Sequence, residues 1–180
     1  MIKTILLLSG CGGTERDREK FLQWREDFVN REEISINANL TVSGGGRFSE
    51  YKLQYNKTTE GETVEVLEPK LIANVRASRR DGATWLSFEG VVLETGAIAE
   101  ERKLSPMMAL PTFVDSIKRG HLEQTWREKL NDETHLVSDL EMPDGTILTL
   151  WQRKDDMMPV YGAFRSGASV VLRIKINEII

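Results

Sequence analysis

The chain has 180 residues, of which 40% are hydrophobic and 29% are charged, a composition typical of one folded domain rather than a disordered segment. Its formal net charge of −4, with scattered basic residues, argues against a nucleic-acid partner, because phosphate binding needs a concentrated basic face. A single cysteine excludes an intramolecular disulfide, and two distant histidines, His121 and His135, supply no metal-ligand set, so we expect no metal and no other cofactor.

The N-terminal residues have the pattern of a lipoprotein signal peptide. Lys3 precedes a short apolar run, and Leu8-Ser9-Gly10-Cys11 resembles the lipobox at which bacterial lipoprotein signal peptides are cleaved. We therefore expect residues 1–10 to be removed and residues 11–13 to form a lipidated tether, with diacylglycerol and palmitate on the cysteine. Since the apolar run is shorter than usual, two alternatives stay open: a first β-strand with a chance cysteine, or a start codon upstream of Met1.

This anchor would place the chain at the extracytoplasmic face of a cell membrane. Removing Lys3 with the signal peptide leaves 23 basic and 28 acidic residues, a formal charge of −5. An acidic body is mildly repelled by anionic lipid, so attachment would depend on acyl chains, at about 0.8 kcal/mol for each buried CH₂.

The first predicted element of the domain formed by residues 14–180 is an amphipathic helix over about 15–30. Thr14 has the character of an N-cap, with an acidic residue three positions later. Phe21, Trp24 and Phe28 recur at helical spacing and would form one aromatic face.

From Ile34 the hydrophobic period changes to two, which predicts β-strands. Residues 34–56 read as a hairpin that turns at three glycines. Turn residues then separate several short apolar segments, which is typical of a meandering antiparallel sheet. These further strands are expected at 63–67, 71–78, 84–88 and 91–93.

A second helical segment begins at Ser105-Pro106 and ends at Gly120, in keeping with the preference for proline at helix starts and glycine after helix ends. We expect Pro111 to kink or split it. A second meander follows, with strands expected at 122–129, 134–140, 146–153, 159–165 and 168–176.

This order of elements resembles the LolA/LolB-like superfamily of lipoprotein carriers and receptors, most closely the lipoprotein-sorting-like and germination lipoproteins of spore-forming Firmicutes. The resemblance implies an α+β, mainly antiparallel β fold: an incomplete, half-open β-barrel with an N-terminal helix and a short lid-like helix over its concave face. It rests on hydrophobicity and turns, with no catalytic signature, and so implies the fold more strongly than the function. The segments that carry it are residues 64–73, 83–96, 104–111, 159–162 and 170–177.

In that superfamily the concave face of the carriers binds acyl chains under a movable lid, which an arginine on a neighbouring strand holds shut. Here the segment 106–119 looks like part of such a lid, and Arg76 and Arg79 are in range to be the arginine. The periplasmic carrier is not lipidated, whereas this chain carries the lipobox-like motif. The resemblance therefore implies a fixed, receptor-like role more than a shuttling one.

The candidate lipid-binding residues are apolar and lie in or near the lid-like segment. Flexible methionine suits variable apolar ligands. The alternative is that these side chains simply fill the core of the barrel. The candidates are Met107, Met108, Leu110, Phe113, Val114, Ile117, Trp85 and Phe88.

We expect no catalytic residue, because the chain has no Gly-x-Ser-x-Gly elbow and neither histidine has an acidic or nucleophilic companion in sequence. The first functional hypothesis is a membrane-anchored lipoprotein that binds an acyl chain or lipoprotein during lipoprotein sorting or envelope biogenesis. The alternative is a non-catalytic lipoprotein that binds and activates an envelope or spore-cortex enzyme through sheet edges such as 168–176, which could also form a homodimer. The sequence leaves the ligand, the partner, the oligomeric state and the kind of host envelope open.

Overall fold

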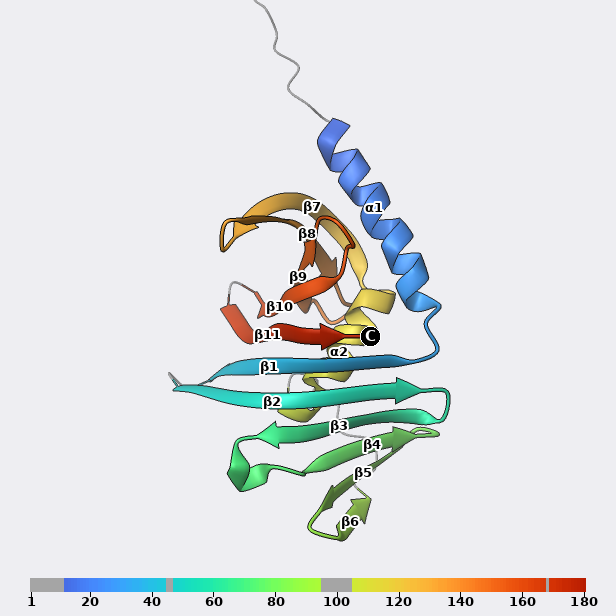
Figure 1. Cartoon of the computed structure of the whole chain (residues 1–180), viewed down its shortest axis with the longest axis vertical. Coiled ribbons are helices and arrows are strands. Elements are labelled where there is room, and N and C mark those ends of the chain that lie inside the picture. Colours follow the sequence, from blue (N-terminus) through green and yellow to red (C-terminus); the bar gives the residue numbers. More distant parts are fainter. Residues whose placement is uncertain (1–11, 45–46, 95–104, 168) are drawn as a thin grey trace, which may run out of the picture.

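A computed structural model describes residues 12–44, 47–94, 105–167 and 169–180. In this part of the chain, two helices accompany one sheet of eleven antiparallel strands in the order β6-β5-β4-β3-β2-β1-β11-β10-β9-β8-β7. The two end strands do not pair with each other, so the sheet is an open half-barrel (Figure 1). This is the predicted fold class. The expected signal peptide and Cys11 lie outside the described residues.

The elements follow the predicted order. The helices are α1 (Gly12–Val29) and α2 (Pro106–Arg119), with a short 3-10 turn, η1 (Lys70–Ile72), between β3 and β4. The strands are β1 (Ile34–Gly44), β2 (Arg47–Thr58), β3 (Gly61–Glu68), β4 (Arg76–Arg80), β5 (Ala83–Phe88), β6 (Val91–Glu94), β7 (His121–Leu130), β8 (Glu133–Glu141), β9 (Ile147–Arg153), β10 (Pro159–Ser166) and β11 (Ser169–Ile179).

The structure differs from three local predictions. The first helix begins at Gly12, ahead of the expected N-cap at Thr14. The second helix runs through Pro111 without splitting, so the split is excluded and the kink stays a prediction. The strand expected over 71–78 starts only at Arg76, because Asn74 adopts φ 68°, a left-handed conformation that an extended strand cannot continue through.

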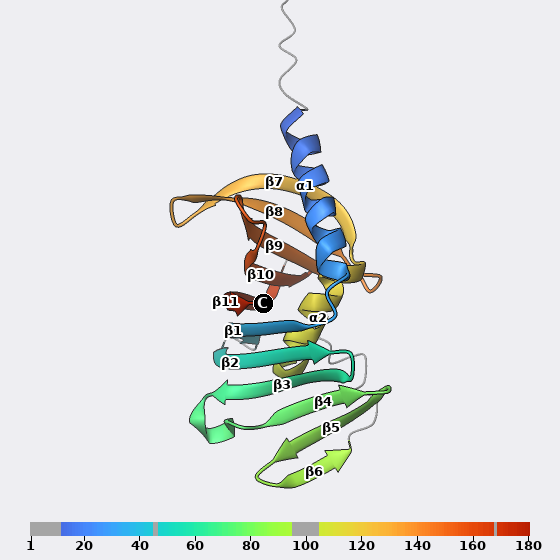
Figure 2. The same cartoon turned by 45° about the vertical axis from the view of Figure 1, so that its right-hand side comes forward.

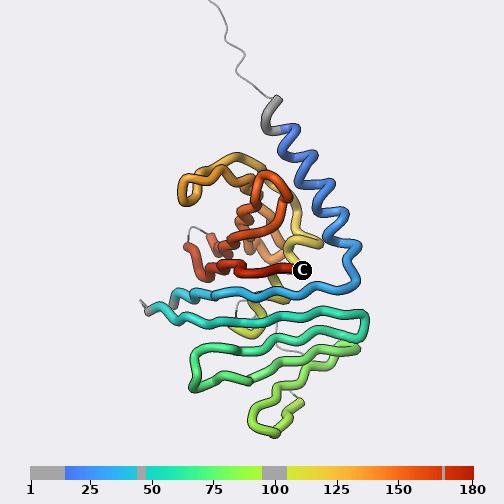
Figure 3. The backbone as a smooth tube through the Cα atoms, viewed as in Figure 1, coloured from blue at the N-terminus to red at the C-terminus, as the bar shows by residue number. Residues whose placement is uncertain are grey.

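The expected edge at residues 168–176 was also wrong, because β11 lies in the middle of the sheet. It pairs with β10 on one side and with β1 on the other, and Figure 3 shows the blue first strand beside the red last strand. Leu172 and Ile174 are fully buried between these neighbours. The sheet edges are β6 and β7 instead.

Helix α2 packs against the concave face of the sheet, where it contacts β1, β2, β3 and β8. Figures 1 and 2 show it passing behind strands β1–β3. The close contact between Phe113 of α2 and strand β10 requires a glycine. A Cβ at Gly162 on β10 would lie 2.8 Å from Cε2 of Phe113. The absence of a side chain at Gly162 therefore gives the Phe113 ring its place in the core.

Helix α1 packs its aromatic face on β7 and α2. The predicted stripe is confirmed, since the Trp24 ring lies 5.8 Å from Phe21 and 5.1 Å from Phe28 between centroids. The two helices also cap each other: Arg25 donates to the carbonyl of Lys118 at 3.0 Å, and Lys118 Nζ donates to the carbonyl of Val29 at 3.2 Å. Cations at helix C-termini stabilise the unpaired carbonyls there. Neither described helix is long and apolar enough to cross a bilayer.

We predict that Phe113→Ala lowers the free energy of unfolding by about 3–5 kcal/mol, because it removes a fully buried ring and leaves a cavity between α2 and β10. The measurement is urea unfolding followed by far-UV circular dichroism. Leu71→Ala is the control, since Leu71 is 88% exposed and its loss should change stability by less than about 0.5 kcal/mol. Equal effects of the two substitutions would contradict the packing described for α2.

Candidate functional site

The concave face of β1–β6 carries two adjacent rows of side chains, which the strand register defines. One row is apolar apart from one hydroxyl and is called the apolar row. The other row contains the charged groups and is called the rim row. The opposite, convex face of the sheet is called the outer face. The apolar row is Ile36, Tyr55, Val64, Ala77, Leu86 and Leu93. The rim row is Ile34, Lys57, Glu62, Arg79 and Thr84.

Helix α2 covers only part of this face. The apolar row is buried on β1 to β4, whereas Leu93 on β6 is 59% exposed. On the same face, Phe88 is 37% exposed and its partner Val91 is 59% exposed. We call Leu86, Phe88, Val91 and Leu93 the open apolar surface. Exposed apolar groups that adjoin one another in this way mark interaction sites more often than single exposed residues do.

The predicted lipid-binding residues of α2 divide into two groups. Leu110, Phe113, Val114 and Ile117 are at most 2% exposed and pack into the main core. Met107 and Met108 are half-buried at the N-terminal end of the helix, where they line a cavity of about 20 Å³ against β3 and β4. A cavity of that size holds about one water molecule. The space under the centre of α2 is therefore filled by its own side chains.

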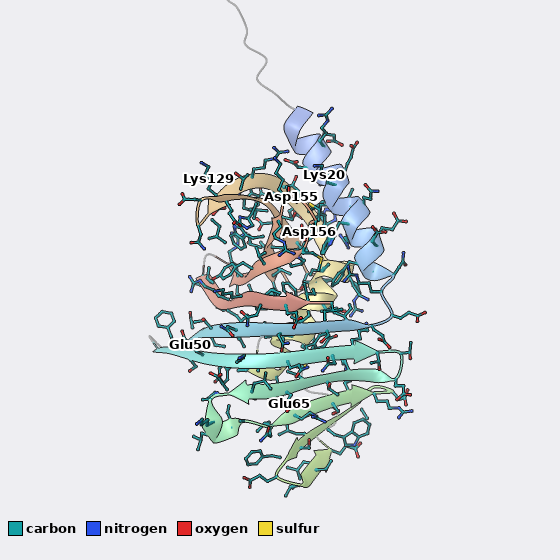
Figure 4. The ribbon with its side chains drawn as sticks, in the orientation of Figure 1. Lys20, Glu50, Glu65, Lys129, Asp155 and Asp156 are labelled. Carbon is teal, nitrogen blue, oxygen red and sulfur yellow. The ribbon has the colours of Figure 1, made fainter. Side chains whose placement is uncertain are left out.

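The two aromatic candidates lie on opposite faces of β5. Phe88 lies on the concave face with α2, as its spacing from Leu86 requires. Trp85 pairs with Ser78 and Glu94 on the outer face. Figure 4 shows Glu50 and Glu65, which also belong to this outer face, on the side of the sheet turned away from α2. Strand alternation could have separated Phe88 from Trp85 and could have added Leu86, Val91 and Leu93.

The two candidate arginines are separated in the same way. Arg76 lies on the outer face and pairs with Glu65 at 2.5 Å, so it cannot reach α2. Arg79 lies on the concave face and pairs with Glu62 at 2.5 Å. Arg79 also lines the small cavity beside Met107 and Met108.

A buried tyrosine completes this arrangement. Tyr55 is fully buried under α2, and its hydroxyl donates to Glu62 at 2.8 Å. Burial raises the pKa of Tyr55, and the negative charge of Glu62 raises it further. The two oxygens of Glu62 thus serve Tyr55 and Arg79, which fixes the carboxylate where the apolar row meets the rim row.

Next to this network is a polar cleft of about 490 Å³. It lies between the β2–β3 turn and the β4–β5 turn and is lined by Lys57 and Arg79 of the rim row. Glu62, Arg79, Thr84 and Met108 line both the cleft and the small apolar cavity. The polar cleft therefore adjoins the small apolar cavity, and Ala77 of that cavity pairs with Leu86 of the open apolar surface.

The other charged clusters have structural explanations. Asp139 is buried and accepts hydrogen bonds from Thr149 at 2.6 Å, Arg165 at 2.8 Å and Gln124 at 2.9 Å. His135 is buried with Nδ1 3.0 Å from the carbonyl of Glu133. Within the part of the chain that the structure describes, no group of three acidic, histidine or cysteine residues could hold a metal ion.

Searches of known protein families and of curated protein sequences gave no match to the chain. Solved structures do share its fold. A domain from Vibrio parahaemolyticus named for outer membrane lipoprotein sorting superposes with a TM-score of 0.53 at 10% identity, covering 91% of this chain and 92% of that one. A DUF1329 family protein from Desulfovibrio piger gives a TM-score of 0.55 at 8% identity and covers 92% of both chains.

A third match, an uncharacterized conserved protein from Thermus thermophilus, has a TM-score of 0.54 at 11% identity and covers 91% of this chain and 86% of that one. At these identities the likeness shows the fold alone. The chain thus has the open half-barrel fold of a lipoprotein-sorting domain. The closer resemblance to proteins of spore-forming Firmicutes stays a prediction.

We predict that the stability of the wild type falls above pH 10 more steeply than that of Tyr55→Phe. The unfolded chain releases the tyrosine proton near its ordinary pKa of 10.0, whereas the folded chain retains it because the pKa is raised. The stability due to this group is therefore present below pH 10 and is lost above it, by about 1.4 kcal/mol per pH unit. Urea unfolding between pH 9 and 11 measures the difference, and parallel curves for the two proteins would contradict the raised pKa of the buried Tyr55.

Proposed function

We propose that this protein is a lipid-anchored envelope protein that binds an acyl chain, free or as part of a lipoprotein, on its concave apolar face. The observation that carries the proposal is the open apolar surface, which continues the buried apolar row past the end of α2. The fold shared with a lipoprotein-sorting domain supports it. In this proposal residues 1–10 are a signal peptide, Cys11 carries the lipid, residues 11–13 are the tether and residues 14–180 are the half-barrel domain at the extracytoplasmic face.

Energetics favours binding beside α2 over binding beneath it. Fully burying one large apolar side chain contributes about 1.5–3 kcal/mol. Releasing Leu110, Phe113, Val114 and Ile117 together would therefore cost about 6–12 kcal/mol, as much as the whole stability of a typical domain. The open apolar surface has no such cost, and an acyl chain gains about 0.8 kcal/mol for each CH₂ that it buries there.

The first turn of α2 is suited to adapt to such a chain. Met107 and Met108 are only half-buried, and methionine side chains adjust to irregular apolar ligands. Both lie at the edge of the open site, whereas the four fully buried residues hold the rest of the helix. A small movement of the methionine side chains would extend the apolar surface without displacing the helix.

The β6 edge supports a second candidate function, the binding of a partner protein by strand addition. Val91, Val92 and Leu93 are each at least 59% exposed on a short strand at the end of the sheet. The opposite edge, β7, carries mainly charged and polar residues, which discourage pairing. An envelope enzyme or a second copy of the chain would pair along β6 in this alternative.

We predict that Leu93→Asp weakens binding of a fluorescent fatty acid by at least about tenfold, because it places an unpaired charge on the acyl-binding face. The matched control is Val92→Asp on the same strand, since its side chain is 63% exposed and lies on the outer face. Titration of residues 11–180, carrying Cys11→Ser, with 11-(dansylamino)undecanoic acid reports both affinities.

The control should bind like the parent protein. Equal loss of binding in the two variants would contradict a site confined to the concave face, and full binding by Leu93→Asp would refute the concave-face site. Thermal unfolding of each variant verifies that the fold is retained, as expected for two largely exposed positions.

A further inference from the structure

We propose that the ligand is an amphiphile with an anionic headgroup, which Lys57 and Arg79 bind at the rim while its chain lies on the open apolar surface. This inference rests on the proposed function, and it adds the chemical class of the ligand and its orientation in the site. The strand register places the charged and the apolar side chains of one face in separate rows.

The rim row carries more positive than negative charge. Lys57 on β2, Glu62 on β3 and Arg79 on β4 are direct cross-strand neighbours, so two cations flank one carboxylate. That carboxylate already accepts a hydrogen bond from Tyr55 and pairs with Arg79. Among the described residues, the ion pairs include none between Lys57 and a carboxylate, and the ammonium group of Lys57 lies next to that of Lys118.

Lys118 of α2 adds another positive charge next to Lys57. Burial lowers the pKa of Lys118 on α2, and the neighbouring Lys57 lowers it further, whereas the carboxylate of Asp115 on the same helix raises it. Lys118 donates to the carbonyl of Val29 and so cannot move away from Lys57 without uncapping α1. Two ammonium groups are thereby held near each other, and an anion between the rim row and α2 would relieve their repulsion.

The cleft supplies the space for a headgroup. Its volume of about 490 Å³ is in the range of small-molecule sites. Its acidic lining residues other than Glu62 are Glu60 and Asp81, which are exposed on the two turns, and Asp81 lies 3.5 Å from Arg80. The inner end, where Arg79 and Met108 meet the apolar cavity, is the end that favours an anion attached to a chain.

The test compares two single-chain lipids that differ in headgroup charge, 1-myristoyl lysophosphatidylglycerol and 1-myristoyl lysophosphatidylcholine, below their micelle concentrations. Isothermal titration calorimetry uses residues 11–180 with Cys11→Ser. We expect the anionic lipid to bind about tenfold more tightly, and Lys57→Gln to remove most of that preference, as for one hydrogen bond to a charged group. Lys57→Arg should retain it.

Lys52→Gln is the matched control, because Lys52 lies on the same strand but on the outer face, 3.9 Å from Glu68. It should leave both affinities unchanged. Equal affinities of the parent protein for the two lipids, or equal effects of Lys57→Gln and Lys52→Gln, would overturn the headgroup assignment while leaving acyl binding intact. Inorganic phosphate binding as tightly as the anionic lipid would overturn it as well, in favour of a free-anion site. Binding of neither lipid would overturn the proposed function itself.

Discussion

Helix α2 packs Phe113 and its apolar neighbours into the centre of the concave sheet, and this contact determines which part of that face a ligand can reach. The ring of Phe113 lies against Gly162, where no side chain could be accommodated without displacing it. Because four residues of the helix are almost completely buried, the interior of the half-barrel is a packed core at its centre. The apolar area that a ligand can reach lies on β5 and β6, beyond the N-terminal end of the helix.

The second determinant is the two-residue alternation of β-strands. On the concave face this alternation places the apolar row beside the charged rim row. In the proposed site the chain of an amphiphile contacts the apolar side and its headgroup contacts the rim row. On the opposite face the same alternation pairs Arg76 with Glu65 and removes Arg76 from any role near α2. Mutual capping through Arg25 and Lys118 then joins α1 to α2, so the helix that directly follows the expected lipid anchor also fixes the helix that borders the site.

Much of this could be predicted from periodicity. The aromatic face of α1, the alternation in β1 and the start and end of α2 all come from local patterns, and the structure confirms them. The central position of β11 could not be predicted, because pairing between the first and last strands depends on contacts 130 or more residues apart in the chain. The division of the α2 candidates into buried and half-buried residues could not be predicted either, since helical spacing does not show how far the sheet extends beneath a helix. The roles of Lys57 and Glu62 depend on the register of neighbouring strands, which no single segment encodes.

The location of a bound acyl chain tests the central claim most directly. A stearic acid carrying a nitroxide near its methyl end, added to methyl-labelled protein, broadens the NMR signals of methyl groups close to the chain. We predict the strongest broadening at Leu86, Leu93, Met107 and Met108, and weaker broadening at Leu110 and Ile117, which lie farther from the chain in the core. Broadening centred on Leu110 and Ile117 would show that the chain displaces α2, and broadening only at the outer-face Val92 would place the ligand on the wrong side of the sheet. Either result would contradict the site described for this protein.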